Sequence, residues 1–387
     1  PLAHLALPVI GHGKVEVEGQ VMPARAALLT AGLEPLVLEP KEGLALLNGT
    51  QMMGAIGALV LAGADRLART ASVAAAISVE ALRGTEVAFS AALQSTRPHP
   101  GQVRTAAELR WLLRDSTIQT AHHSDDHRVQ DPYSLRCVPQ VHGAARDAFD
   151  QLRRVLDIEL NSATDNPLVF PEGGEVPEDA LATGRGLVIS GGNFHGEPVA
   201  LALDYAKLAL AELGAISERR VALLLDPRLN DGLPAFLGAS SGLDSGLMIL
   251  QYTAAALASE SKTLAHPASA DSIPTSANQE DHVSMGSIAA RNAMTVLEHS
   301  ERIVAIELIC ATQGLDLRLD LEPGTAAGAG VTEARSGVRA VVERLERDRE
   351  PGPDLEAAYR LVHECELADL ALAPSTAQAA WLGPDPR

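Results

Sequence analysis

Five consecutive hydrogen-bonding side chains, at positions 278–282 in the stretch TSANQEDHVSMG, are the first feature that could do chemistry. The stretch opens a long segment with helical apolar periodicity, and polar groups near an apolar surface need hydrogen-bond partners. One interpretation is therefore a binding or catalytic site. The other is a solvated loop in which Asp281 is the N-cap of a helix that runs to about Gln313. Taken alone, the stretch leaves both interpretations open.

An amide, a phenol and a guanidinium follow one another at three-residue spacing: Gln130, Tyr133 and Arg136. Asp131-Pro132 is typical of a cap followed by a first-turn proline, so we expect a helical turn over 133–136 that Pro139 ends. The three side chains would then be neighbours. Because arginine can fork onto a carboxylate, the pattern indicates a platform for a carboxylate-bearing ligand. An interhelical salt bridge of the arginine is the alternative.

Two further polar stretches stand beside expected helices. Asn48-Gly49-Thr50 precedes an Ala/Leu-rich segment and, without other residues, predicts an ordinary turn and cap. In SGGNFHGEP, residues 190–198, the glycine pair lets backbone approach closely, and Phe194 is either the wall of a pocket or core packing.

Acids and histidines gather at His122, His123, Asp125, Asp126 and His127, in the manner of metal ligands. No second HExxH-like frame or cysteine pair completes a site, and such neighbours are common in loops. We therefore predict no metal centre.

The elements that must position these residues are predicted to be helices. Hydrophobic residues make up 46% of the chain and aromatic residues only 3%, which suits close helix–helix packing. Residues 14–24 alternate with period two and predict a small hairpin or two short strands turning at Gly19. Apolar periodicity predicts the helices, at about 43–83, 103–114, 143–160, 198–226, 244–265, 281–313, 332–349 and 354–370.

The fold class is therefore mainly α, a bundle of long helices. Helices of thirty or more residues are about 45 Å long, so we expect them to associate side by side, between subunits. We expect short strands and a linker over 1–45, the site residues and the central bundle over 46–320, and helices with a loose tail over 321–387.

The net charge and the cysteines indicate which partners and which cellular compartment to expect. Fifty acidic against thirty-one basic residues give a formal charge of −19, which has no general attraction for nucleic acid or anionic membranes. The most apolar run, Gly54–Gly63, is too short to span a bilayer. Three widely spaced cysteines, Cys137, Cys310 and Cys365, fit reduced thiols in a cytoplasmic protein.

Six stretches, in this order, resemble the aromatic amino acid lyase family: PLAHLALPVIG at the start, LLNGTQ at 46–51, QDPYSLRCVPQVHG at 130–143, SGGNFHGEPVA at 190–200, SERR at 217–220 and TSANQEDHVSM at 275–285. The resemblance covers almost the whole chain. It implies a mainly α-helical homotetramer with a central bundle of long helices, with active sites shared between subunits and carbon–nitrogen lyase activity.

The resemblance also implies an electrophile. The family's methylidene-imidazolone forms by cyclisation of an Ala-Ser-Gly triplet, a few residues before the PLAHLAL-like run. Because this sequence begins at that run, we expect the triplet and a catalytic tyrosine loop in a missing N-terminal segment of the same protein. This chain alone is then expected to be inactive.

Motif match implies a role for each site residue. Arg136 would hold the substrate carboxylate, and Asn48 would lie beside the electrophile and that carboxylate. Gln130 and Tyr133 would line the site and orient substrate or electrophile, with Tyr133 a second candidate for the base besides the tyrosine of the missing segment. Phe194 would contribute an apolar wall.

Glu280 is the clue to the substrate. A carboxylate facing an imidazole can accept its N–H or pair with its cation. Family members directed at phenylalanine or tyrosine resemble one another in a neutral amide at this place. Glu280 therefore favours L-histidine, from which elimination of ammonia gives trans-urocanate in histidine degradation.

Two alternatives remain open. One is a phenylalanine or tyrosine ammonia-lyase, or an aminomutase, on the same scaffold. The other is a non-catalytic helical scaffold, which follows if the natural polypeptide lacks the electrophile triplet.

Overall fold

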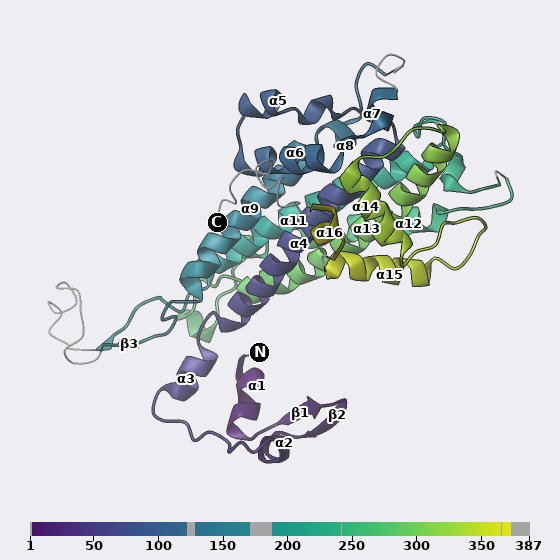
Figure 1. Ribbon diagram of the computed structural model, residues 1–387. Helices are drawn as coiled ribbons and strands as arrows, with labels where there is room; N and C mark the ends of the chain where they lie inside the picture. Colours follow the sequence, from purple (N-terminus) through teal and green to yellow (C-terminus); the bar gives the residue numbers. More distant parts are fainter. Residues whose placement is uncertain (1, 122–127, 171–187, 241, 365, 373–387) are drawn as a thin grey trace. The chain divides into compact units, whose positions relative to one another are not determined.

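The computed structural model describes residues 2–121, 128–170, 188–240, 242–364 and 366–372, and most of them are helical (Figure 1). The chain divides into two compact units, each built from three separated stretches. The first unit comprises Pro1–Ala58, Arg154–Leu203 and Pro267–Ala290, and the second comprises Leu59–Arg153, Asp204–His266 and Arg291–Arg387. The mainly α class predicted from the composition is confirmed. The division expected at 45 and 320 stays a prediction.

The first unit contains the short strands. Strands β1 (Lys14–Val17) and β2 (Gln20–Pro23) pair antiparallel. Glu18 and Gly19 connect them with φ of 50° and 78°, so a two-residue turn with both φ positive closes the hairpin. This confirms the predicted turn at Gly19. The strands β3 (Leu168–Val169) and β4 (Val188–Ile189) form a second antiparallel pair.

Short helices make up much of the rest of the first unit. They are α1 (Leu2–Ala6), η1 (Leu7–Ile10), α2 (Ala24–Thr30), α3 (Glu42–Leu47), η4 (Ala268–Ala270) and η5 (Ser276–Asn278). The segment predicted as one or two helices over 43–83 is two, because the chain leaves the helical path at 48–50 between α3 and the next helix.

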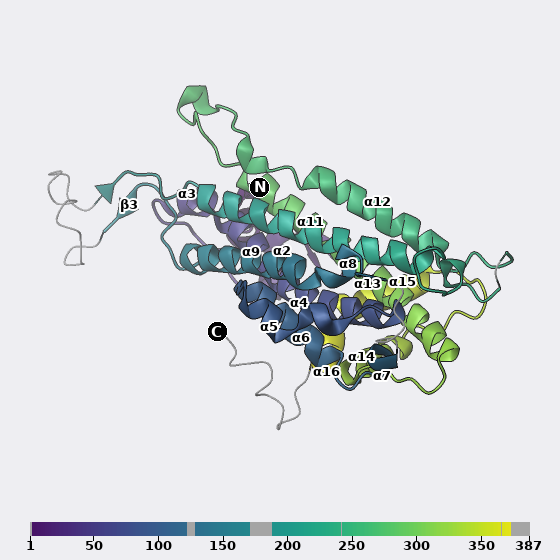
Figure 2. The same cartoon turned by 90° about the horizontal axis from the view of Figure 1, so that it is seen from above.

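Four long helices dominate the chain: α4 (Gln51–Ala81), α9 (Val138–Glu159), α11 (Glu197–Leu225) and α13 (Gly286–Leu321). Within the second unit these helices pack side by side, together with α12 (Met248–Leu264), as Figures 1 and 2 show. Each of the four buries apolar side chains completely, for example at Leu67, Leu152, Leu210 and Ile306. Such contiguous burial of aliphatic side chains is the main stabilising contribution to the unit.

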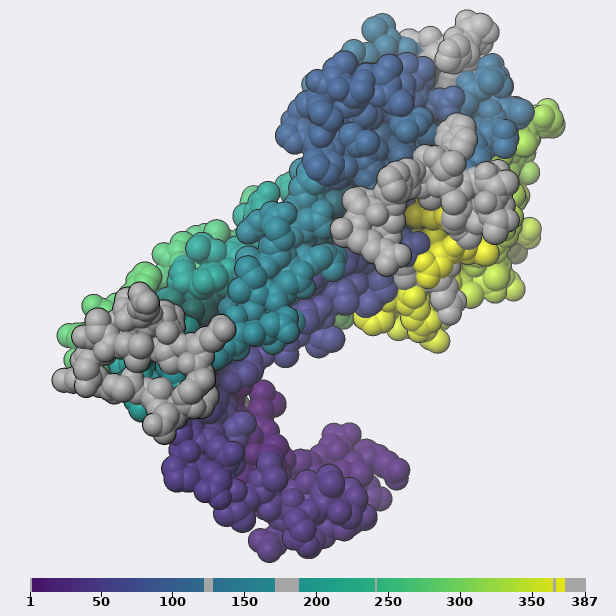
Figure 3. Space-filling view, turned by 60° about the vertical axis from the view of Figure 1, so that its left-hand side comes forward, coloured from purple at the N-terminus to yellow at the C-terminus, as the bar shows by residue number. Residues whose placement is uncertain are grey.

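The second unit also carries shorter helices around these four. They are η2 (Glu86–Phe89), α5 (Ala91–Ser95), α6 (Pro100–Leu112), α7 (Thr117–Ala121), α8 (Tyr133–Arg136), η3 (Ala235–Leu237), α14 (Ala329–Arg339), α15 (Gly352–His363) and α16 (Glu366–Leu372). The segment that contains α5 and α6 is blue in Figure 3 and lies on the face shown there. Trp111 of α6 is buried.

Several predicted helix ends are wrong, for reasons that lie in tertiary contacts. Helix α13 continues past Gln313 to Leu321, and Gly314 does not end it but packs closely there, since an added Cβ would lie 3.2 Å from Leu224 and 3.3 Å from Ala81. Helix α14 ends ten residues before the expected Arg349. The side chain of Gln313 hydrogen-bonds both the N–H and the carbonyl of Leu345, which satisfies that backbone outside a helix.

The prediction that Pro139 ends a helical turn is wrong. Pro139 lies in the first turn of α9, where its missing N–H costs nothing, so the helix begins five residues before the predicted Gly143. The segment predicted as a helix over 354–370 is two helices, α15 and α16. The end of the chain after residue 372, where the loose tail was predicted, and the cluster at 122–127 fall outside the described residues.

By length and composition alone, the stretch Glu42–Ala81 could cross a membrane. A core helix of a helical bundle passes the same test. In the second unit, α4 buries Leu67, Ala71 and Ile77 completely against protein, so this part of the helix belongs to the protein core.

Candidate active site

The three residues of the predicted platform come together in the second unit, around α8. The Arg136 guanidinium donates from Nε to the carbonyl oxygen of Asp131 at 2.9 Å and from Nη2 to Oε1 of Gln130 at 3.0 Å. It also lies over the ring of Tyr133, 4.5 Å from the centroid, as a cation–π contact. Nη1 of Arg136 has no partner among the described residues, so one edge of the fork is free for a carboxylate.

The platform faces outward in this chain. Tyr133 is 70% exposed, and Gln130 is exposed as well. The interhelical salt bridge considered for Arg136 is not formed within the described residues, whose ion pairs do not include this side chain. The arrangement is therefore that of a binding surface rather than of a structural ion pair.

Helix α8 begins differently from the prediction. Pro132 occupies the N-cap position with no side-chain cap, so Asp131 does not cap this helix. Its Oδ2 instead accepts the N–H of Thr85 at 2.7 Å. Arg128 reaches the same region, donating from Nη1 to the carbonyl of Leu82 at 3.0 Å. The segment before α8 is thus hydrogen-bonded to the residues that follow α4.

In the first unit, Asn48 stands at the junction of α3 and α4. It is the C-cap of α3, and its N–H donates to the carbonyl of Leu44 at 2.9 Å. The next residue must be glycine, because a Cβ on Gly49 would lie 2.5 Å from Oε1 of Gln51 and 2.9 Å from the carbonyl oxygen of Thr164. The turn expected at Asn48-Gly49-Thr50 is present, and the close backbone approach fixes where the Asn48 side chain begins.

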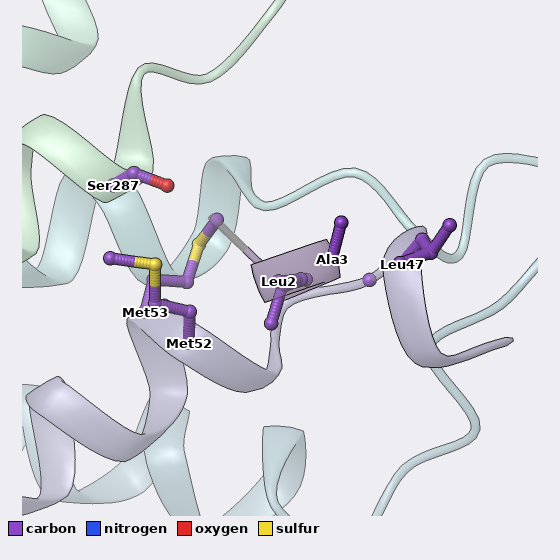
Figure 4. A pocket seen from close by; sticks show the side chains of 7 residues that line it. Leu2, Ala3, Leu47, Met52, Met53 and Ser287 are labelled. Carbon is purple, nitrogen blue, oxygen red and sulfur yellow. The ribbon is translucent and has the colours of Figure 1, made fainter. Parts of the chain in front are cut away.

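A pocket of about 320 Å³ opens beside this junction. Met52 and Met53 of α4 and Ser287 of α13 line it together with Gly49 and Leu47 (Figure 4). Leu2 and Ala3 of α1 complete the lining. The volume lies at the lower end of the range for small-molecule sites, and the lining is mostly apolar. Because Leu47 and Gly49 line it, the pocket adjoins Asn48, which is a predicted site residue.

The starts of α11 and α13 both pack closely against Met53. A Cβ on Gly196, before α11, or on Gly286, at the start of α13, would each lie 2.6 Å from its Sδ. Both glycines are buried. The polar stretches that precede these two helices, 190–195 and 275–285, are therefore anchored around one buried methionine.

Glu280 lies in a loop, not in a helix. Residues Thr275 and Glu280 form an isolated antiparallel bridge, and Oγ1 of Thr275 donates to Oε2 of Glu280 at 2.6 Å. Ser276, Ala277 and Asn278 all have positive φ between 48° and 69°, a strained course for non-glycine residues. The N-cap role predicted for Asp281 is wrong, because α13 begins five residues later, at Gly286.

An imidazole that the sequence did not single out fastens this loop. Nε2 of His195 lies 3.1 Å from the carbonyl oxygen of His282, and Nδ1 of His195 accepts the N–H of Glu197 at 3.3 Å. The signal available in the sequence was a histidine two residues before a helix start. Phe194, its neighbour, is half-buried and does not line the pocket beside Asn48.

The six predicted site residues thus form two groups. Gln130, Tyr133 and Arg136 are brought together by hydrogen bonds and ring contact in the second unit. Asn48, Phe194 and Glu280 belong to three segments of the first unit, and among its described residues no hydrogen bond joins them. In the described part of the chain no cluster of acids, histidines and cysteines could hold a metal ion.

The chain is 51% identical over 369 residues to histidine ammonia-lyase of Gloeobacter violaceus, covering 95% of this chain and 68% of that protein. It is 54% identical over 362 residues to histidine ammonia-lyase of Sorangium cellulosum, covering 94% and 68%.

Solved structures agree. Histidine ammonia-lyase from Trypanosoma cruzi matches with a TM-score of 0.85 and 43% identity, over 99% of this chain and 70% of that one. Tyrosine aminomutase from Streptomyces globisporus matches with a TM-score of 0.84 and 38% identity, over 95% and 71%. Residues 1–340 match the sequence model of the aromatic amino acid lyases. The chain therefore belongs to the aromatic amino acid lyase family.

Proposed function

We propose that the chain belongs to a histidine ammonia-lyase, a carbon–nitrogen lyase that eliminates ammonia from L-histidine without oxidation to give trans-urocanate. The observation that carries this proposal is the free edge of the Arg136 fork, held by Gln130 and Tyr133 for a carboxylate. The 51% to 54% identity to histidine-directed relatives supports the choice of substrate, as does the carboxylate at Glu280.

The residues divide the work of binding. Arg136 pairs with the substrate carboxylate through Nη1, since Nε and Nη2 already have protein partners. Glu280 accepts the imidazole N–H or pairs with the imidazolium, and Thr275 orients its carboxylate through Oγ1. Phe194 supplies an apolar wall for the ring. Contacts of this kind orient a bound substrate.

A base must then take the β-proton, a step that contributes roughly 10²–10⁴-fold in rate. Tyr133 is one candidate, because its exposed ring lies on the platform next to the carboxylate-binding arginine. The catalytic tyrosine loop that the family resemblance implies supplies the other candidate.

The group that the family implies for this chemistry is methylidene-imidazolone, formed from an Ala-Ser-Gly triplet; it would supply an electrophile that makes ammonia a better leaving group. Two amides fit such a group. Gln130 uses Oε1 for Arg136, which leaves its Nε2 donor for a carbonyl oxygen. Asn48 presents a second amide, from the turn that Gly49 and Thr164 fix.

We propose the same assembly as for the family, a homotetramer that shares its sites. Exposed apolar side chains on two neighbouring helices of the second unit support it: Tyr205 and Leu208 on α11, and Ile249 and Tyr252 on α12. An apolar stripe of this kind on a soluble helical protein marks a contact surface. A cytoplasmic location remains part of the proposal, and the free thiols of Cys137 and Cys310 are consistent with it.

A substrate panel tests the function. The full-length gene product is incubated separately with L-histidine, L-phenylalanine and L-tyrosine, and released ammonia is measured. Turnover of histidine alone is expected. Turnover of phenylalanine or tyrosine instead would favour the ammonia-lyase or aminomutase alternative on this scaffold. No turnover of any of the three, by a polypeptide whose mass shows no cyclised triplet, would favour the non-catalytic scaffold.

A further inference from the structure

A fully buried ion pair lies at the centre of the second unit. Arg220 of α11 donates to Glu307 of α13 from Nε at 2.5 Å and from Nη2 at 2.8 Å, and both side chains are 0% exposed. The geometry is a two-bond fork onto one carboxylate. Two unlike charges so far from water need such geometry to offset their loss of hydration.

Two hydroxyl groups complete the carboxylate's hydrogen bonds. Ser78 of α4 donates to Oε1 of Glu307 at 2.7 Å, and Ser217 of α11 donates to Oε2 at 2.6 Å. Each oxygen therefore accepts one N–H and one O–H. The network joins three of the four long helices and leaves the carboxylate fixed in position and in plane.

The remaining arm of Arg220 reaches the platform. Its Nη1 donates to the carbonyl oxygen of Ser134, in the middle of α8, at 3.3 Å. Helix α8 has only four residues, Tyr133–Arg136, and a helix of one turn does not hold its own shape. Its place depends on what its backbone contacts, and Ser134 lies between the two platform residues Tyr133 and Arg136.

We propose that Arg220 is a positioning residue for Arg136. Glu307 fixes the guanidinium, the guanidinium fixes the carbonyl of Ser134, and α8 then presents Arg136 and Tyr133 to the substrate carboxylate at a set place. This inference rests on the proposed function only for its kinetic consequence. The mechanical claim, that Arg220 orders α8, stands independently of the substrate.

Burial energetics favour this role over simple stabilisation. Replacing a buried ion pair by well-packed apolar side chains is often neutral or stabilising, so the pair adds little that leucine or methionine could not. What apolar side chains cannot do is donate a hydrogen bond to the Ser134 carbonyl. The network therefore fixes geometry, and the geometry it fixes is that of α8.

The second unit contains a matched control. Arg146 of α9 forks onto Glu108 of α6, and both are buried. Its spare bonds run to the carbonyl of Ala68 and to Oγ of Ser72, both on α4 and not on α8. Replacing either arginine by lysine keeps the positive charge, but a single ammonium cannot form the two parallel hydrogen bonds of a guanidinium.

The test compares Arg220→Lys with Arg146→Lys in the full-length protein. Hydrogen exchange of the amides of Arg136 and Cys137, whose N–H groups bond back to Pro132 and Tyr133, reports the order of α8 without any substrate. We expect exchange there to rise at least tenfold in Arg220→Lys and to stay unchanged in Arg146→Lys. If exchange of these amides is equal in the two variants, or if it does not rise above the wild-type rate in Arg220→Lys, the proposal is overturned.

Kinetics supply the second readout. If the wild type turns over L-histidine, KM should rise roughly 10- to 100-fold in Arg220→Lys, since a misplaced binding group costs that much. The fall in kcat should be smaller, and Arg146→Lys should keep its KM. A wild type without histidine turnover defeats the proposed function but leaves the exchange result intact. If Arg220→Lys does not fold, the apolar pair Arg220→Met with Glu307→Met takes its place, with the same expected loosening of α8.

Discussion

Nε2 of His195 donates a hydrogen bond to the carbonyl oxygen of His282 at 3.1 Å, and the two rings stack with centroids 5.9 Å apart at an angle of 1°. A carbonyl can only accept, so Nε2 carries the proton. Nδ1 of His195 accepts the N–H of Glu197 at 3.3 Å, which requires that same neutral tautomer. One imidazole thus ties the start of α11 to the loop that carries Glu280.

His195→Asn and His195→Gln separate the two bonds. Asparagine can still accept the N–H of Glu197 as a helix cap, but it is too short to reach His282. Glutamine reaches toward the His282 carbonyl. We expect His195→Asn to keep its melting temperature and to lose roughly tenfold in kcat/KM for L-histidine, about the value of one hydrogen bond. His195→Gln should keep more activity. Equal activity in the two variants would show that the hydrogen bond between His195 and the His282 carbonyl does not matter for activity.

Arg136→Lys tests the carboxylate platform. Lysine keeps the positive charge but loses the planar fork and the stacking on Tyr133. KM for L-histidine should rise roughly tenfold or more, because lysine loses the bonds to Asp131 and Gln130 that hold the Nη1 donor toward the substrate carboxylate. Because Arg136 is not buried, the melting temperature should hardly change. An unchanged KM in a folded, active variant would show that the substrate carboxylate binds elsewhere.

Glu80 makes stability depend on pH. Burial raises the pKa of this carboxyl from 4.5 to about 7, although hydrogen bonds from Ser116 and the N–H of Gly328 act in the opposite direction. Because the folded-state pKa lies above the unfolded one, its contribution to stability is complete below pH 4.5 and is lost as pH rises through 7. The loss is about 3 kcal/mol by pH 8.

Glu80→Gln should remove this dependence. Urea unfolding of wild type and variant at pH 5 and pH 8 measures it, and the variant should lose about 2.5 kcal/mol less between the two pH values. Parallel pH profiles for the two proteins would show that Glu80 does not titrate as described.

Gly143→Ala tests the crossing of α6 and α9. A Cβ on Gly143 would lie 2.3 Å from the backbone nitrogen of Gln102, and one on Gly101 would lie 2.1 Å from the carbonyl oxygen of Gly143. Backbone atoms on both sides cannot move aside, so we expect a loss of about 2–3 kcal/mol in the free energy of unfolding. Gly352→Ala is the control, because nothing lies within 4 Å of its added Cβ. Equal stability of the two variants would contradict the tight crossing.

Long helices were predictable from the sequence because their apolar periodicity persists for many turns. The helix that ends near Asp226 was placed within a residue, and Gly214 did not interrupt it. Boundaries set by tertiary contacts were not predictable. Gly314 reads as a break in the sequence but is a contact point for Leu224 in the structure.

The site divides in the same way. The platform of Gln130, Tyr133 and Arg136 followed from local spacing, since one short turn brings the three together. The roles of His195 and Arg220 depend on partners 87 and 86 residues away, at His282 and Ser134. No local pattern specifies such pairs, so the sequence could not reveal them.

The most direct test of the account is the reaction itself, followed with the full-length gene product and L-histidine. Ultraviolet absorbance reports the conjugated product urocanate while ammonia is assayed in the same sample. We predict equimolar appearance of both, and in Glu280→Gln a loss of turnover of roughly 10- to 100-fold at an unchanged melting temperature, as expected for a charge-assisted contact. Ammonia and urocanate absent with histidine, in a protein whose mass shows the cyclised triplet, would contradict histidine as the substrate.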